Sequence, residues 1–182
     1  LSGRIDIAIG LGPDERLSVE AGGAVSKAWL DPSVAAISFV TVHGGPLADV
    51  RVRQALNYAV NKTAIIDNLF GGLTTPATQG VSHQAYGYNP DLQPYPYDPD
   101  KAKSLLVEAG YPDGFEFVFL TQTGLGSGTL LFQQVAADLA RVGVTMEVRQ
   151  LPAAAYLNTI LRDPTHGGAG AHSTIWPAWP IF

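Results

Sequence analysis

Apolar and polar residues follow one another along the chain in patterns that predict strands and helices in turn. Short runs of alternating or β-branched apolar residues predict strands over residues 5–9, 34–42, 115–121 and 144–150. Helical spacing of apolar residues, with N-capping residues and terminal glycines, predicts helices over residues 12–20, 49–60, 62–69, 99–109, 129–142 and 152–161. Strands that alternate with helices favour an α/β fold with a mostly parallel or mixed sheet.

The helix expected over residues 49–60 carries the clearest local signals. Asp49 is a good N-cap residue, because its side chain can accept a hydrogen bond from the first turn. Four apolar residues then lie at positions i, i+3, i+4 and i+7, namely Val52, Ala55, Leu56 and Ala59. This spacing places them on one apolar face of the helix.

The neighbouring helices carry similar start and stop residues. Asn61 can cap a short helix that Gly71–Gly72 ends. Asp98 and Pro99 supply the N-cap and the first helical residue of a later helix, and Gly110 lies just past its end.

Two segments lack a clear period. Residues 73–96 contain Pro, Gly, Tyr and Asn, and we expect a long surface loop that is either functional or packed down by its own aromatic residues. The final twenty residues hold Gly167–Gly168 and a cluster of Trp and Pro, and we expect these residues to be loop-like.

Composition narrows the class of protein. The 182 residues are 46% hydrophobic and 15% charged, which describes one ordinary globular domain over residues 1–182. The net charge of −5 argues against a nucleic-acid partner, since such proteins usually carry a basic face. The chain has no cysteine, which excludes disulfides, thiol catalysis and cysteine-bound zinc. No apolar run approaches the length of about 18 residues that spans a bilayer, so we expect no membrane insertion of this segment.

The two ends of the sequence suggest a longer protein. The chain starts at Leu1 with neither an initiator methionine nor a signal peptide, and it stops at Phe182 without a polar tail. We therefore expect both ends to be cuts within a longer polypeptide.

Three blocks of the sequence are similar to one known family. Residues 46–66 read PLADVRVRQALNYAVNKTAII, residues 97–111 read YDPDKAKSLLVEAGY, and residues 3–7 read GRIDI. In their motifs, order and separation these blocks resemble the extracellular solute-binding proteins of family 5, which belong to peptide- and nickel-type ABC importers. The resemblance covers nearly the whole chain.

That resemblance implies a fold and a function. The chain is expected to be one lobe of a type II periplasmic-binding-protein fold, a mixed sheet flanked by helices, and specifically the contiguous second lobe. The other lobe is absent from this chain. The whole protein would capture a small solute or short peptide between two lobes and deliver it to the ABC transporter permease subunits, with no catalysis and no cofactor. It would be periplasmic or extracytoplasmic, with a signal peptide in its precursor and a lipid anchor in a Gram-positive source.

Arg51 and Arg53 lie in the block at residues 46–66. Either could bind an anion, but charged residues beside an apolar helical stripe usually form a solvated or salt-bridged face. We interpret the block as structural, with Asp49 capping its helix and Arg53 held by a local carboxylate or by carbonyl groups.

Ligands of open α/β folds bind beyond the carboxyl ends of strands. Gln122 and Thr123 follow the strand expected at residues 115–121, and His43 lies in the turn after residues 34–42. We take these three residues as candidate ligand contacts, together with His172 in the terminal segment.

The segment after His172 holds the most informative candidates. By resemblance, Trp176, Pro177 and Ala178 match the start of the Gly-Trp-x-Ala-Asp-Tyr stretch that lines the cleft in the family. Trp179 stands where the family has an Asp that can pair with the α-ammonium group of a peptide. A buried ammonium without a carboxylate is costly, so Trp179 favours an apolar, aromatic or otherwise less cationic ligand. Packing of both tryptophans at the edge of the lobe is the alternative interpretation.

Other kinds of site fit the sequence less well. The histidines have spacings that match no metal-ligand pattern, so no metal site is expected; they are His43, His83, His166 and His172. The Gly124–Gly128 loop lies between a strand and a helix, as a phosphate-binding loop does, but it lacks the P-loop lysine. A nucleotide-binding domain that uses this loop remains the alternative function. A hydrolase is not favoured, because no Gly-x-Ser-x-Gly elbow is present.

Overall fold

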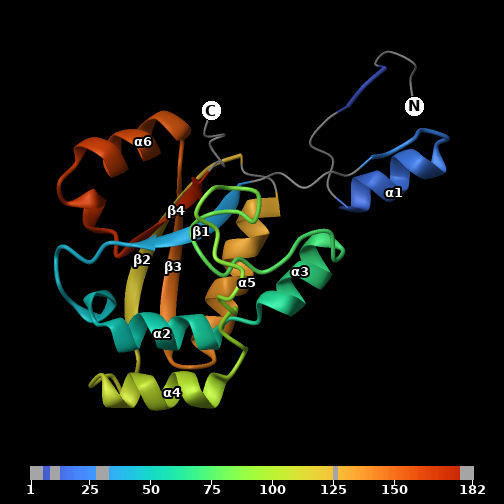
Figure 1. Cartoon of the computed structure of the whole chain (residues 1–182). Helices are drawn as coiled ribbons and strands as arrows, with labels where there is room; N and C mark the ends of the chain where they lie inside the picture. Colours follow the sequence, from blue (N-terminus) through green and yellow to red (C-terminus); the bar gives the residue numbers. More distant parts are fainter. Residues whose placement is uncertain (1–5, 9–12, 28–32, 125–126, 177–182) are drawn as a thin grey trace.

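A four-stranded mixed sheet forms the centre of the protein (Figure 1). The computed structural model describes residues 6–8, 13–27, 33–124 and 127–176. The strands are β1 (Val34–Phe39), β2 (Phe115–Gln122), β3 (Val144–Leu151) and β4 (Ala171–Trp176), in the spatial order β1-β4-β2-β3. Strand β2 pairs in parallel with both β3 and β4, and β1 pairs antiparallel with β4. The expected α/β fold with a mixed sheet is confirmed.

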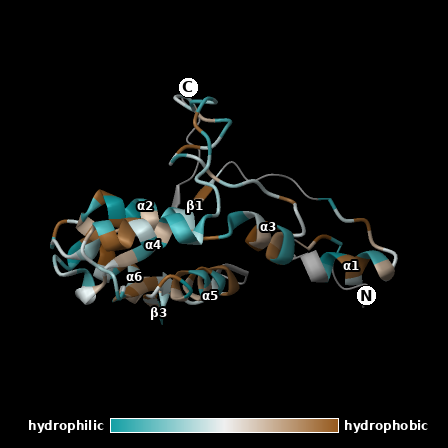
Figure 2. Ribbon diagram, turned by 90° about the horizontal axis from the view of Figure 1, so that it is seen from below, coloured by the Kyte–Doolittle hydropathy of each residue, from teal (hydrophilic) through white to brown (hydrophobic). Residues whose placement is uncertain are grey.

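Helices cover both faces of the sheet. The helices of the described chain are α1 (Pro13–Ala21), which does not pack on the sheet, α2 (Val50–Ala59), α3 (Lys62–Phe70), α4 (Pro99–Glu108), α5 (Ser127–Ala140) and α6 (Ala153–Arg162), with the short 3₁₀ turns η1 (Pro46–Ala48) and η2 (His166–Gly168). Helices α2 to α5 share one core with Phe117 and Phe119 of β2, whereas α6 packs with Leu120 and Val118 on the opposite face. In both Figure 1 and Figure 2, α1 lies apart from the sheet.

The capping residues read from the sequence act as expected. The Asp49 side chain accepts a hydrogen bond from the backbone N–H of the second residue of α2. Asn61 accepts one from the third residue of α3, and Asp98 does the same for α4. Gly71 ends α3 in the left-handed conformation, with φ of 56°, which glycine adopts without steric cost.

The core on the α2–α5 side is formed by the apolar face predicted for α2. Its residues Val52, Ala55, Leu56 and Ala59 are all buried. They pack in the same cluster as Phe119, which is fully buried and whose ring centroid lies 4.6 Å from that of Phe132 on α5. Burial of this apolar face therefore fixes α2 against the sheet.

A close backbone contact explains why glycine is needed where residues 114 and 143 meet. Gly114, with φ of 76°, immediately precedes β2, and Gly143 immediately precedes β3. A Cβ atom on Gly114 would lie 1.9 Å from the carbonyl oxygen of Gly143. Only glycine fits there, so the two parallel strands can begin side by side.

The long loop between α3 and α4 is confirmed. Residues 71–98 are all described and contain neither helix nor strand. Tyr95 from this loop packs edge-to-face on Tyr58 of α2, with ring centroids 5.1 Å apart. The loop is thus held against α2 in part by its own aromatic residues.

Three predictions about strands need correction. Residues 6–8 form no strand, although a strand was expected over 5–9; residues 5 and 9 lie outside the described part. Strand β1 ends at Phe39 rather than at Val42. The final twenty residues are not all loop, because β4 runs inside the sheet with partners on both sides. Its sequence AHSTIW has little apolar alternation, and its strand conformation depends on pairing with β1 and β2.

Candidate functional site

The carboxyl ends of β2 and β4 meet at one edge of the sheet, which we call the carboxyl edge. The two strands are parallel, with Leu120 opposite His172. Strand β2 ends at Gln122, and β4 ends at Trp176. The backbone of Thr123, next along the chain, donates a hydrogen bond of 2.9 Å to Leu151 O at the end of β3. Three strand ends therefore converge at this edge, as in many ligand-binding α/β folds.

Two predicted ligand contacts lie at the carboxyl edge and are at least partly accessible to solvent. Gln122 is half-buried and Thr123 is exposed. Trp176 ends β4 at the same edge. Pro177, Ala178 and Trp179 lie outside the described residues.

His172 lies within β4 rather than in a terminal loop. It faces Ser38 of β1 across the antiparallel pair and is half-buried. Burial lowers the pKa of its imidazole, because the charged form loses solvation; a hydrogen bond with Ser173 O acts in the opposite direction, and the charge of His166 adds to the lowering. His172 is therefore a predominantly neutral polar group within the sheet.

His43 lies at the opposite edge of the sheet from Gln122. The turn that carries it follows β1, and β1 runs antiparallel to β4. The structure does not bring His43 together with Gln122 and Thr123. Instead, His43 lies beside His166 of η2, with His43 Nε2 3.4 Å from His166 Nδ1.

A groove of about 750 Å³ lies along that opposite edge. It is lined by the turn after β1, the first halves of β2 and β3, and the segment before β4, including Val40, His43, Phe117, Glu147 and Gly170. Glu147 forms an exposed ion pair with Arg149 at 2.6 Å, and the hydrogen bond from Arg149 lowers the pKa of Glu147. The groove thus offers both apolar and charged groups.

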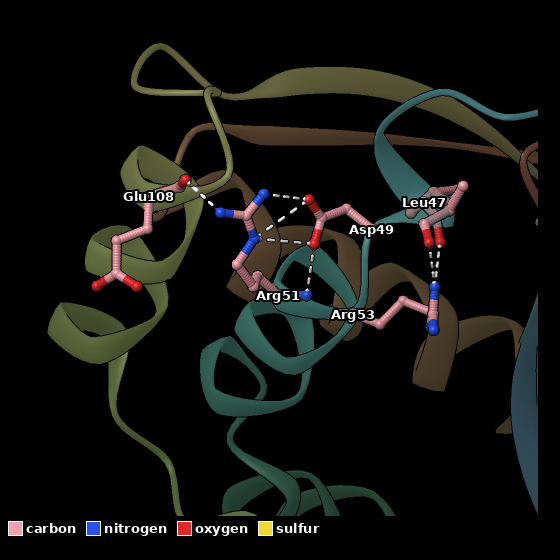
Figure 3. Close-up of polar contacts among 6 residues, drawn as sticks. Leu47, Asp49, Arg51, Arg53 and Glu108 are labelled. Carbon is pink, nitrogen blue, oxygen red and sulfur yellow. Dashed lines mark hydrogen bonds and ion pairs between the residues drawn. The ribbon is translucent and has the colours of Figure 1, made fainter.

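Arg51 connects α2 with α4 (Figure 3). Its Nη2 donates to Asp49 Oδ2 at 2.6 Å, and its Nη1 donates to the carbonyl oxygen of Glu108 at 2.7 Å. The hydrogen bond from the Arg51 side chain is the main reason that the pKa of Asp49 falls to about 2. Arg51 is therefore occupied by structural contacts.

Arg53 is held by carbonyl groups, as interpreted from the sequence. Its Nη1 donates to Leu47 O at 2.9 Å and to Ala48 O at 2.8 Å, both in η1 (Figure 3). Arg53 therefore ties the start of α2 to the preceding turn. Neither arginine of this block lies at the carboxyl edge, which supports the structural interpretation.

Asp138 was not singled out in the sequence. It is almost fully buried on α5, and its carboxylate accepts hydrogen bonds from Asn61 N and Arg141 Nη1, both at 3.0 Å. Beside it lies a cavity of about 310 Å³ between α3 and α5. Because each carboxylate oxygen has a partner, Asp138 serves to join the start of α3 to α5.

The described residues offer neither a three-ligand metal cluster nor a membrane-spanning helix. In the described part of the chain, no group of three or more His, Cys, Asp or Glu residues could hold a metal ion. Among the same residues, no helix is long and apolar enough to cross a membrane. For the nucleotide alternative, residues 125–126 of the Gly124–Gly128 loop lie outside the described part.

Comparison with known proteins identifies one family over nearly the whole chain. The family described as bacterial extracellular solute-binding proteins, family 5 Middle, matches residues 1–181. Heme-binding protein A of Haemophilus influenzae is 44% identical over 116 residues, which are 62% of this chain and 21% of that protein. The glutathione-binding protein GsiB of Salmonella typhimurium is 40% identical over 108 residues, 59% of this chain and 21% of that protein. The matched part is about a fifth of the length of these curated relatives.

A solved structure agrees with these relatives. The periplasmic binding protein DppA from Helicobacter pylori, in complex with the peptide STSA, is 26% identical and has a TM-score of 0.71. The similarity covers 94% of this chain and 33% of DppA. The fold of a periplasmic binding protein is therefore confirmed for this chain. The nucleotide-binding alternative gains no support from these proteins.

Proposed function

Because the chain belongs to the bacterial extracellular solute-binding proteins of family 5, we propose that the whole protein is the substrate-binding component of an ABC importer. It captures a small solute outside the cytoplasm, delivers it to the permease subunits and catalyses no reaction. The observation that carries this proposal is the family match over residues 1–181. The relatives are named as binding proteins for heme and for glutathione, and the structural neighbour holds a peptide.

Residues 1–182 form one lobe of this protein, and the ligand lies between it and a second lobe. The matched part is 21% of each relative, which leaves ample chain for that second lobe. The hinge mechanism follows from this arrangement: a ligand that touches both lobes stabilises the closed form, whereas the open form is favoured without it.

The carboxyl edge forms this lobe's wall of the cleft. Gln122 supplies an amide that can donate and accept hydrogen bonds, and Thr123 supplies an exposed hydroxyl group. Trp176 ends β4 at the same edge, and Pro177, Ala178 and Trp179 follow it in the sequence. His172 lies four residues before the end of β4 and contributes a half-buried neutral imidazole.

The ligand is a peptide-like or aromatic solute without a buried ammonium group at this wall. This class is supported by Trp179, which stands where the family's ammonium-pairing Asp is expected. Tryptophan offers a large rigid face for stacking and one N–H donor. Glutathione, heme and short peptides, which the relatives are named for, are the first solutes to test.

Isothermal titration of the protein at its full natural length with reduced glutathione, hemin and a tetrapeptide tests the proposal. We expect saturable binding of at least one of them. Gln122→Ala and Thr123→Ala should each weaken it by about threefold to tenfold, the cost of one lost hydrogen bond. Gln133→Ala is the matched control, since Gln133 is exposed on α5. Wild-type affinity in both edge variants would contradict the assignment of the carboxyl edge.

A further inference from the structure

Two histidines that are 123 residues apart in the sequence meet beside the groove. His43 lies in the turn after β1, and His166 begins η2 after α6. His43 Nε2 and His166 Nδ1 are 3.4 Å apart, with ring centroids at 5.6 Å and an interplanar angle of 61°. We infer that His43 and His166 form a two-histidine site for a divalent transition-metal ion, of which Zn²⁺ is the best match.

The distance between the two nitrogens fits this role. Imidazole nitrogens bind Zn²⁺ at about 2.0–2.1 Å, and tetrahedral angles then place two such nitrogens about 3.3–3.4 Å apart. The observed separation of 3.4 Å matches that value, so the two nitrogens are spaced as two ligands of one ion would be. Neutral imidazole also suits Zn²⁺, Ni²⁺ and Cu²⁺ better than it suits Mg²⁺ or Ca²⁺.

The backbone holds His166 in an unusual conformation at this place. Its φ is 50°, and it is the only non-glycine residue with positive φ in the described part of the chain. The Asp163 carboxylate fixes the turn by accepting hydrogen bonds from Thr165 N at 2.8 Å and Gly167 N at 3.0 Å. Strained residues held by their surroundings occur preferentially at functional sites.

The electrostatic setting favours a cation. Asp163 accepts a hydrogen bond from Gly167 N, the residue next to His166, so a carboxylate lies in the same turn as one of the two imidazoles. Glu116 and Glu147 line the same groove as His43. Glu147 is balanced by its ion pair with Arg149, but Glu116 adds an exposed negative charge.

The groove leaves room for the remaining ligands of the ion. His43 is exposed and the groove has a volume of about 750 Å³, so water can fill the positions that the two histidines leave open. Among the described residues, no third His, Cys, Asp or Glu joins the pair, so water would complete the coordination of the ion. It lies at the opposite edge of the sheet from Gln122 and does not depend on the proposed function.

Isothermal titration of the protein at its full natural length with ZnCl₂ tests the inference. We expect one specific binding event. His43→Gln and His166→Asn should each raise the Kd for Zn²⁺ by about tenfold or more, because loss of a residue that only hydrogen-bonds a metal ligand already costs about that much affinity. Asn tolerates the positive φ of residue 166, so the fold is retained. His83→Gln is the control, because His83 is an exposed histidine in the 71–98 loop.

A direct hydrogen bond between the two imidazoles is the competing explanation for their approach. Under that explanation, the wild-type protein binds no Zn²⁺, or the variants at His43, His166 and His83 all bind it equally. Either result overturns the inference. Loss of binding in the His43 and His166 variants, with the His83 variant unchanged and all circular-dichroism spectra alike, supports it.

Discussion

At the scale of single residues, the carboxylate of Asp49 has two structural roles. It caps α2 through the N–H of Arg51, and it also accepts hydrogen bonds from the Arg51 side chain. Arg51 in turn reaches the carbonyl oxygen of Glu108 at the end of α4. The most strongly family-like block therefore organises helix packing, and the candidate ligand contacts lie elsewhere.

The pKa of Asp49 predicts a specific loss of stability in acid. Its folded value of about 2 lies below the ordinary value of 3.8, so the ionised form is favoured by folding. This contribution is fully present above pH 3.8 and is lost as the pH falls towards 2. Thermal unfolding followed between pH 5 and about pH 2.5 should therefore show a smaller decrease in Tm for Asp49→Asn than for the wild type.

Asn is the matched replacement because it keeps the N-cap and removes only the ionisation. Asp49→Ala should have a lower Tm than Asp49→Asn at neutral pH, because it also loses the cap. Parallel pH curves for the wild type and Asp49→Asn would show that Asp49 has an ordinary pKa.

At the scale of elements, the hydrogen bonds of Asp138 determine how α3 meets α5. Its carboxylate accepts a hydrogen bond from the backbone N–H of Asn61, which would otherwise be an unpaired donor at the start of α3. It also accepts a hydrogen bond from Arg141, the residue that follows α5. One buried carboxylate thus joins two helices through backbone and side-chain donors.

Removal of that carboxylate should destabilise the lobe. We expect Asp138→Ala to lower the free energy of unfolding by about 1–3 kcal/mol, the cost of leaving a buried donor unpaired. Asp138→Asn should cost less, since its amide oxygen can still accept from Asn61 N. Urea unfolding at neutral pH measures both variants, and equal stabilities of Asp138→Ala and the wild type would contradict this role.

Local signals predicted most of the elements, and pairing between distant segments decided the rest. The caps at Asp49, Asn61 and Asp98 were predicted because a cap bonds within its own first turn. Strand β4 was missed because its conformation depends on pairing with β1, in which Ser38 pairs with His172, 134 positions later in the chain. The same pairing sets the direction of β1.

The candidate site residues also fall into those that the sequence alone could place and those whose position depends on pairing between distant segments. Gln122 and Thr123 could be placed at a strand end from the sequence alone, since β2 is marked by its own apolar run. The position of His43 depends on β1 being antiparallel, which no local pattern encodes. Its approach to His166 joins residues 123 apart, so no ligand spacing in the sequence could indicate it.

At the scale of the whole molecule, the wall that we propose for a shared ligand is one edge of the sheet. Three strand ends converge at Gln122, Leu151 and Trp176, and the helices of the family block lie away from them. A wall of this kind makes only part of the contacts that a ligand needs. The 182-residue chain alone should therefore bind the proposed solute weakly or not at all, and nanomolar binding by this chain would contradict a shared cleft.

Closure of two lobes around a ligand is the central claim, and small-angle X-ray scattering tests it most directly. The measurement compares the protein at its full natural length without ligand and with a saturating concentration of the solute that binds best among glutathione, hemin and the tetrapeptide. Hinge closure predicts a smaller radius of gyration in the ligand-bound protein. An unchanged radius of gyration at saturation would contradict the account.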